Sequence, residues 1–304
     1  LPRLATAAKA KGAALLVEGR PNRGCATGAN ELGHMRYFVE TEMCYCGHPG
    51  CLERIVSTEF LRRRGVESGT LKLDEDVNEK LTSWKVPGNA FDATHKVTLR
   101  GLLSMTGGIG VPGFLGYEAG APLPTLPQIL DGSPPANSPP VTVIAVPGSA
   151  YHYSGGGYEI AEALMQDATG KPFPHLMQDL VLGPMGMTAS SFDQPPGAAF
   201  AAKAASGHFG DGTELPGRGH VFPEHAAAGL WSTPTDLAKL LVELADVWQG
   251  LSSIFLRRQT LEEMLTPQNG GPYGLGAAIA GDGASLVLMK RGQNVGYQGY
   301  LILY

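Results

Sequence analysis

Three of the four cysteines lie close together in the chain and could bind a metal ion. Cys44, Cys46 and Cys51 fall within eight residues, and Cys25 lies further upstream. One residue separates Cys44 from Cys46, which is too close for a disulfide framework. Such crowding is typical of a metal site in a reducing compartment. We therefore expect a metal-binding segment near the N-terminus and a cytoplasmic protein.

A second possible chemistry is acyl transfer, which needs a nucleophilic hydroxyl and a base beside it. A Ser and a Lys three positions apart on a helix project from one face and could supply both. No Ser in the sequence has a Lys three positions later. The two threonine versions of this spacing are Thr6 with Lys9 and Thr82 with Lys85. Thr6 lies near a terminus that we expect to fray.

The composition is typical of a soluble globular protein with a sizeable core, since 43% of the residues are hydrophobic and 17% are charged. The net charge is −5 and no basic stripe stands out, which predicts that nucleic acid is not a partner. No apolar run is long enough to cross a membrane, so we expect no membrane partner. The N-terminal residues lack a Met and a secretory hydrophobic segment, which indicates a processed or trimmed chain.

Local patterns predict helices and a terminal sheet. Helices are expected over 51–64, over 157–169 with Gly170 at the end, between Pro172 and Gly183, and from Thr233 onward. Thr233 is a candidate N-cap, because Pro234 and an acidic residue at the third helical position follow it. Short runs joined by glycines over 272–280, 284–289 and 298–304 predict antiparallel strands, and residues 13–29 predict a hairpin. The Gly/Pro-rich segment 110–148 indicates a lid or a site wall.

The stretch 146–158, VPGSAYHYSGGGY, resembles the second catalytic motif of the β-lactamase-like serine hydrolases, which include class C β-lactamases and family VIII carboxylesterases. Further patches match in the same order: ESGTLKLDEDV, VTLRGLLSMTGGI, DLVLGPMGMTASSF, AAGLWSTPTDLAKLL and GQNVGYQGYLIL. The resemblance covers about 66–304. It implies an α/β, β-lactamase/transpeptidase-like fold, in which helices flank an antiparallel sheet and the active site lies between the sheet and a helical lobe.

The resemblance also implies site residues. Tyr153 takes the position of a tyrosine whose oxygen shuttles a proton, with its pKa lowered by nearby cations. Lys290 supplies the cation of the third motif, and the strand beyond Gly292 offers an oxyanion-hole N–H. Gly155 replaces a common Asn, as in esterase-like relatives, and Met105 replaces a common His and is expected in the core. Taken alone, Tyr-Ser-Gly is typical of a turn, and a lysine on an edge strand usually blocks aggregation.

The first motif of that family, Ser-x-x-Lys, is missing. Counting back along the family pattern leads to Cys51 and Leu52, and neither begins an x-x-Lys motif. Cys51 could act as a thiol nucleophile, but we favour a metal-ligand role for it. Thr82 falls where the family has a surface turn, so neither threonine pair is a good candidate.

The segments GANELGH (28–34) and CYCGHPGCLE (44–53) resemble the signature of the ROK family of sugar kinases and repressors. The resemblance covers about 13–64 and implies that His34, Cys44, Cys46 and Cys51 bind a structural zinc ion. One imidazole and three thiolates suit tetrahedral zinc, although without metal the same residues would form an ordinary polar loop. Glu31 would contact a sugar hydroxyl. The family's ATP-binding loop and catalytic Asp have no place in this sequence, so we predict no kinase activity.

The simplest interpretation is a fused chain. Residues 1–64 form a ROK-like zinc-motif fragment, and residues 65–304 form a hydrolase domain whose first motif is absent and whose C-terminus is short of a strand and a helix. Strands from 13–29 would complete the sheet. The predicted function is serine-hydrolase-type acyl transfer on small-molecule esters, β-lactams or peptides, impaired by the missing motif. The alternatives are a non-catalytic pocket protein on the same fold and a zinc-stabilised, sugar-binding remnant.

Overall fold

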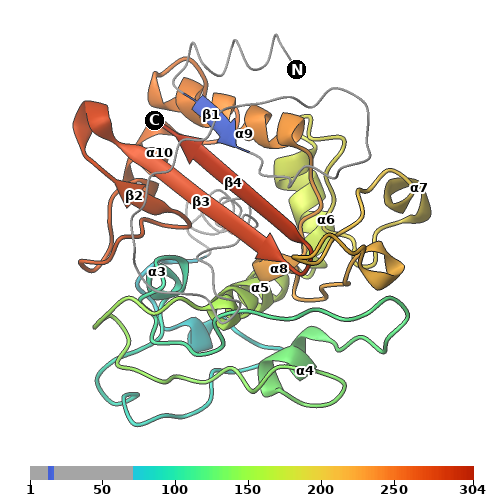
Figure 1. Cartoon of the computed structure of the whole chain (residues 1–304). Coiled ribbons are helices and arrows are strands. Elements are labelled where there is room, and N and C mark those ends of the chain that lie inside the picture. Colours follow the sequence, from blue (N-terminus) through green and yellow to red (C-terminus); the bar gives the residue numbers. More distant parts are fainter. Residues whose placement is uncertain (1–12, 17–70) are drawn as a thin grey trace.

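The structure is a computed structural model that describes residues 13–16 and 71–304 (Figure 1). Within these residues, four antiparallel strands form a sheet in the order β1-β4-β3-β2. Their bounds are β1 (Ala13–Leu16), β2 (Ala278–Ala280), β3 (Val287–Asn294) and β4 (Tyr297–Leu303). β3 and β4 make a tight hairpin in which Asn294 pairs with Tyr297, and Gly296 adopts the positive φ that such a turn requires.

The predicted C-terminal antiparallel sheet is confirmed, with different strand bounds. Residues 272–277 do not join it, because the N–H of Leu275 donates to Met264 and the N–H of Gly276 donates to Leu103, both outside the sheet. A short helical turn, Gly283–Ser285, precedes β3, which then runs five residues past the predicted end at 289. Residues 13–16 pair with β4, as we hypothesised. Residues 17–29, the predicted helix 51–64 and the boundary near Gly65 lie outside the described residues.

Two helices of fifteen residues carry much of the packing. α5 (Gly155–Thr169) begins after the N-cap Ser154 and ends at Gly170, which has a left-handed backbone as predicted. α9 (Pro234–Trp248) is capped by Thr233, whose Oγ1 accepts a hydrogen bond from the N–H of Asp236. Its apolar stripe is buried, and the helix packs against β1 and β4 (Figure 1).

Shorter helices complete the described part. They are α3 (Leu99–Leu103), α4 (Leu126–Asp131), α6 (Phe173–Met177), α7 (Ala198–Ala201), α8 (His225–Ala228) and α10 (Arg258–Met264). α6 continues into a wider π-helical turn, Gln178–Leu182, which ends at Gly183, so this predicted helix is confirmed. No helix among the described residues combines the length and the apolar character that a bilayer span needs.

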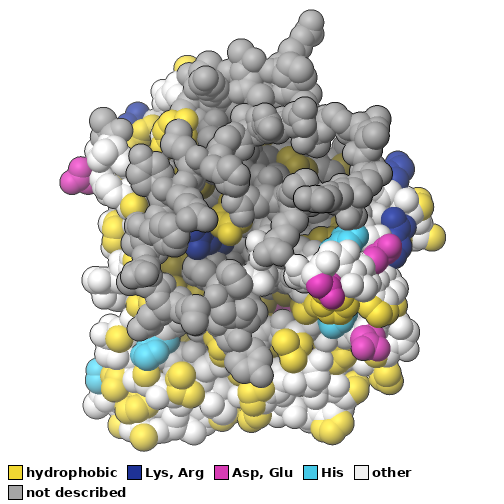
Figure 2. Space-filling view, in the orientation of Figure 1, with side chains coloured by type: hydrophobic (Ala, Val, Ile, Leu, Met, Phe, Trp, Pro, Cys, Tyr) yellow, Lys and Arg dark blue, Asp and Glu magenta, His cyan; other side chains and the backbone are white. Residues whose placement is uncertain are grey.

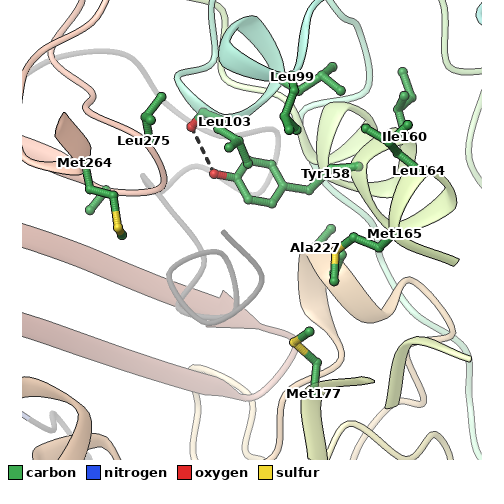
Figure 3. Close-up of a cluster of buried hydrophobic side chains, with 14 of the residues drawn as sticks. Leu99, Leu103, Tyr158, Ile160, Leu164, Met165, Met177, Ala227, Met264 and Leu275 are labelled. Carbon is green, nitrogen blue, oxygen red and sulfur yellow. Dashed lines mark hydrogen bonds between the residues drawn. The ribbon is translucent and has the colours of Figure 1, made fainter. Parts of the chain in front are cut away.

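The core joins the helices to the sheet region (Figure 3). Tyr158 of α5 is fully buried, and its hydroxyl donates to the carbonyl of Leu103 at the end of α3, 3.0 Å away. Met264 and Leu275 approach the same core from the C-terminal part of the chain. This packing fixes the start of α5 relative to α3, and both flank the loop that carries Tyr153.

Candidate active site

The loop that carries Tyr153 is held through its neighbours on both sides. The N–H of His152 donates to the carbonyl of Met105 (2.7 Å), and the N–H of Ser154 approaches the Met105 sulfur (3.3 Å). The Ser154 hydroxyl donates to the carbonyl of Gly110 (2.7 Å) and also caps α5. Met105 is buried in the core, as predicted, and has a positive φ. The Tyr153 side chain is half-buried at the edge of the core.

Glycines at the start of α5 allow residues 110–114 to pack directly on the helix. The N–H groups of Gly155 and Gly156 donate to the carbonyls of Pro112 (3.1 Å) and Val111 (2.9 Å). A Cβ at position 155 would lie 3.0 Å from Cε2 of Phe114, and one at position 156 would lie 2.9 Å from the Gly110 oxygen. A larger residue at position 155, such as the Asn of many relatives, would displace this segment. At this point the Gly/Pro-rich stretch therefore packs against the start of α5, directly after the Tyr153 loop.

Lys290 lies in the middle of β3 with its side chain on the buried face. It is 1% exposed and pairs across the sheet with Leu301, which is fully buried. Its Nζ lies 5.4 Å from the centre of the Tyr273 ring. A lysine is rarely buried to this extent without compensating interactions, and the electron-rich face of an aromatic ring is one of them.

Tyr273 brings the Tyr153 loop and β3 together. Its ring stacks on Tyr151, with centroids 5.3 Å apart and an interplanar angle of 29°. Because Tyr151 is two residues before Tyr153, the same ring contacts both the second-motif loop and Lys290. Sequence reasoning missed Tyr273, because it lies in a run predicted as a strand and no motif marked it.

Gly292 pairs with Gly299 of β4, and on the opposite edge of β3 no described strand pairs at this level. The first residue of β2, Ala278, pairs with Met289. Beyond Met289, no strand of the described part borders this edge of β3. In general, backbone N–H groups along a strand can bind an extended ligand or a polarised carbonyl.

The pair Thr82 and Lys85 serves a surface turn, in agreement with our prediction. The N–H of Thr82 donates to Oδ2 of Asp167 (2.6 Å), and the Lys85 ammonium donates to the carbonyls of Asn78 and Leu81. Both side chains of the pair are exposed.

The other sequence-based candidates lie outside the described residues. They are Thr6, Glu31, Cys51 and the other proposed zinc ligands His34, Cys44 and Cys46. Within 13–16 and 71–304, no group of three or more His, Cys, Asp or Glu side chains could hold a metal ion. The zinc site therefore stays a prediction.

A short helix, α8, links α5 to the end of β3. Carboxylates of α5 accept hydrogen bonds from the first N–H groups of α8: Glu162 from Ala226 (2.9 Å) and Glu159 from Ala227 (3.0 Å). At the other end of α8, the Asn294 amide donates to the carbonyl of Ala228 (2.9 Å). α8 therefore holds the helix that follows Tyr153 at a defined distance from the strand that carries Lys290 (Figure 1).

Buried acidic groups surround the start of α8. Burial raises the pKa of Glu224 to about 7, and the negative charge of Glu162 adds to this. Burial opposes a charge on His225, but the attraction and the 3.1 Å hydrogen bond of Glu162, together with the charge of Glu224, raise its pKa. The imidazole is thereby stabilised in its charged form next to Glu162.

The comparisons with known proteins agree with both predicted resemblances. Residues 64–304 match the family model described as Beta-lactamase, and residues 5–97 match that of the ROK family. No curated protein matches the chain.

Solved structures share the fold of the chain. The octameric penicillin-binding protein homologue from Pyrococcus abyssi has a TM-score of 0.60 and 22% identity, over 84% of this chain and 61% of that one. The D-amino acid amidase from Ochrobactrum anthropi has a TM-score of 0.56 and 21% identity, over 84% and 74%. EstCE1, a hydrolase with promiscuous acyltransferase activity, has a TM-score of 0.57 and 18% identity, over 84% and 78%. The predicted β-lactamase-like α/β fold is thus confirmed.

Proposed function

Because the chain belongs to the Beta-lactamase family, we propose that it carries an acyl-transfer site of the serine-hydrolase type between the start of α5 and β3. The observation that carries the proposal is the placement of Tyr273, which contacts both Tyr151 in the second-motif loop and Lys290 on β3. Two segments that are separated by more than 130 residues and that match two motifs of one family therefore adjoin in space.

The three proposed site residues have different roles. The Tyr153 oxygen takes the proton from the attacking group as the acyl bond forms, and returns it to the leaving group as the old bond breaks. The Lys290 ammonium favours the ionised phenol of Tyr153 by charge. A backbone N–H of β3 beyond Gly292 would stabilise the oxyanion.

The attacking group itself is unassigned. The described residues contain no Ser-x-x-Lys sequence, and the exposed turn at Thr82 does not replace it. Cys51 lies outside the described residues. We propose that turnover is impaired relative to enzymes that have the complete motif.

Small esters are the favoured substrates, with β-lactams and peptides as further candidates. The side chains that pack near the Tyr153 loop are largely apolar: Phe114 lies against Gly155, the Met105 sulfur approaches the Ser154 N–H, and Tyr151 stacks on Tyr273. An apolar wall favours a neutral acyl group over a charged one. EstCE1 is described as a hydrolase with promiscuous acyltransferase activity and the neighbour from Ochrobactrum anthropi as a D-amino acid amidase, and both descriptions support acyl transfer as the reaction proposed here.

The test combines turnover with a covalent probe. Hydrolysis of p-nitrophenyl butyrate and nitrocefin should be measured for the native chain, for Tyr153→Phe and for Tyr304→Phe, an exposed control. We expect Tyr153→Phe to lose roughly 100-fold or more in kcat/KM, because general acid–base groups typically contribute that much. Intact-protein mass spectrometry after treatment with a fluorophosphonate or penicillin, followed by peptide mapping, would identify the attacking residue.

A different outcome would favour the alternative, a non-catalytic pocket protein on this fold. The missing Ser-x-x-Lys sequence is the observation that supports it. If the native chain shows no turnover and forms no mass adduct, the result would support this alternative and reject the enzyme. If Tyr153→Phe turns over as fast as the native chain, the result would reject the assigned role of the phenol.

We also propose a structural zinc ion held by His34, Cys44, Cys46 and Cys51, in a cytoplasmic protein. The support is the crowding of thiols together with the ROK match over 5–97. Elemental analysis of the purified chain should give one zinc per chain, and Cys46→Ser should lose it. A glucose titration of the native chain and of Glu31→Gln would test the sugar-binding remnant.

A further inference from the structure

We propose that Tyr273 is a positioning residue that holds the Lys290 ammonium against the second-motif loop through the face of its ring. The inference rests on the proposed function, since it explains how a buried cation would be kept in place for Tyr153. In the site described above, Tyr273 is only a contact between the Tyr153 loop and β3, and the role proposed here acts through Lys290 rather than on a substrate.

The surroundings of Lys290 make the ring contact important. Lys290 is 1% exposed, Tyr273 is 6% exposed, and Leu288 and Leu301 on the same face of the sheet are buried. The attraction between an ammonium and an aromatic face is stronger when water is excluded from the pair. The 5.4 Å distance from Nζ to the ring centre lies within the range of that interaction.

The ring of Tyr273 is itself fixed from several directions. It stacks on Tyr151, and its backbone carbonyl accepts a hydrogen bond from the N–H of Gln268 (2.8 Å). In the same loop, the Asn269 amide donates to the Thr106 hydroxyl (2.8 Å), which ties the loop to the segment that also holds His152. A shift of the ring would therefore disturb the second-motif loop and Lys290 together.

A packing role and a positioning role make different predictions. Packing depends on the shape of the side chain at 273, whereas attraction to the ammonium depends on the electrons of the ring. Fluorine atoms withdraw electrons from the ring face and change its shape only slightly. A series at position 273 from Phe to mono-, di- and trifluorinated phenylalanine separates the two roles.

The experiment measures urea unfolding of the full chain across this series, with Lys290 present and with Lys290→Met. With Lys290 present, we expect the unfolding equilibrium constant to rise by roughly tenfold from Phe to the trifluorinated ring, since a buried pair of this kind is worth about 1–2 kcal/mol. With Lys290→Met, the unfolding equilibrium constant should stay the same along the series. Equal slopes in the two backgrounds, or no slope in either, would overturn the proposal.

Tyr300 provides a matched control on the same hairpin. Arg291 lies over its ring at 5.1 Å, but this cation is exposed. The same fluorinated series at 300 should show a weaker response, and Lys290→Met should leave it unchanged.

A second measurement applies if Lys290→Met does not fold. The ε-methylene protons of Lys290 should resonate upfield of the other lysines in the native chain and in Tyr273→Phe, because they lie over a ring. A Lys290 signal among those of the other lysines in the native chain would contradict the contact.

The readouts also separate this inference from the proposed function. Unfolding and resonance measurements need no turnover. If the chain is inactive but its unfolding equilibrium constant rises along the fluorinated series, the result would reject the proposed function and retain the contact between Tyr273 and Lys290. In an active chain, the basic limb of the pH–rate profile should move to lower pH along the series, which a packing role alone would not produce. Activity with a flat series would reject the role of Tyr273 and leave the acyl-transfer site standing.

Discussion

The substitution Glu224→Gln should remove a pH dependence of stability that is built into the start of α8. Glu224 is fully buried beside Glu162, His225 and Tyr117. Burial raises the pKa of its carboxyl from an ordinary value of 4.5 to about 7. The folded protein therefore holds this proton more tightly than the unfolded chain does.

The sign and the size follow from that difference. Well below pH 4.5 the carboxyl is protonated in both states and costs nothing, and as the pH rises towards 7 the carboxyl ionises in the unfolded chain while it stays protonated in the folded protein. Stability falls through this window, and above about pH 7 the full cost applies. The rise from 4.5 to about 7 corresponds to about 3 kcal/mol in the free energy of unfolding.

Urea unfolding at intervals between pH 4.5 and 8.5 measures the effect. The native chain should lose about 3 kcal/mol more than Glu224→Gln over this range. The slope with pH is the observable, since the new amide adds an offset that does not change with pH. His225, whose pKa is also raised, contributes stability that is lost as the pH rises. The larger part of that contribution comes from Glu162 and is present in both proteins, whereas the smaller part that comes from the charge of Glu224 is removed by the substitution. Glu214→Gln, at an exposed carboxylate, is the control and should follow the native chain. Parallel curves for Glu224→Gln and the native chain would refute the reasoning.

Three further predictions concern the elements around the site. Asn294→Ala removes the hydrogen bond to the Ala228 carbonyl and should lower the free energy of unfolding by about 1 kcal/mol, measured in urea; an unchanged midpoint would contradict the link between α8 and β3. Gly156→Ala places a methyl group 2.9 Å from a backbone oxygen and should destabilise by about 1–3 kcal/mol, whereas Gly197→Ala, with nothing within 4 Å, should change the melting temperature little. Thr82→Val should leave the hydrolysis of p-nitrophenyl butyrate unchanged, because the residue lies in an exposed turn; a loss of turnover would restore Thr82 as a nucleophile.

The elements with local signals could be predicted from the sequence. Thr233, Pro234 and Asp236 mark a helix start through groups that lie within four residues of one another, and Gly170 marks a helix end through its own backbone freedom. The C-terminal strands were also predictable in kind, but not in their bounds. Residues 272–277 have a strand-like pattern, yet the N–H groups of Leu275 and Gly276 donate to the end of α10 and to α3.

The candidate site was predicted only in part. Tyr153 and Lys290 were found through family motifs. In the structure, Tyr153 lies in the same loop as Tyr151, which stacks on Tyr273, and Lys290 lies over the Tyr273 ring. Tyr273 carried no motif of its own. The acidic groups at the start of α8 gave no signal either, because Glu162 and His225 are 63 positions apart and ordinary in type.

The sequence by itself determined the family resemblances, the helix caps, the cysteine cluster and the absence of a Ser-x-x-Lys nucleophile, because each depends on residues close together in the chain. Only the tertiary structure decided that Lys290 is buried under an aromatic ring, that α8 joins α5 to β3, and that burial raises the pKa of Glu224. These properties depend on which distant segments exclude water from a side chain and which groups then lie within a few ångströms of it.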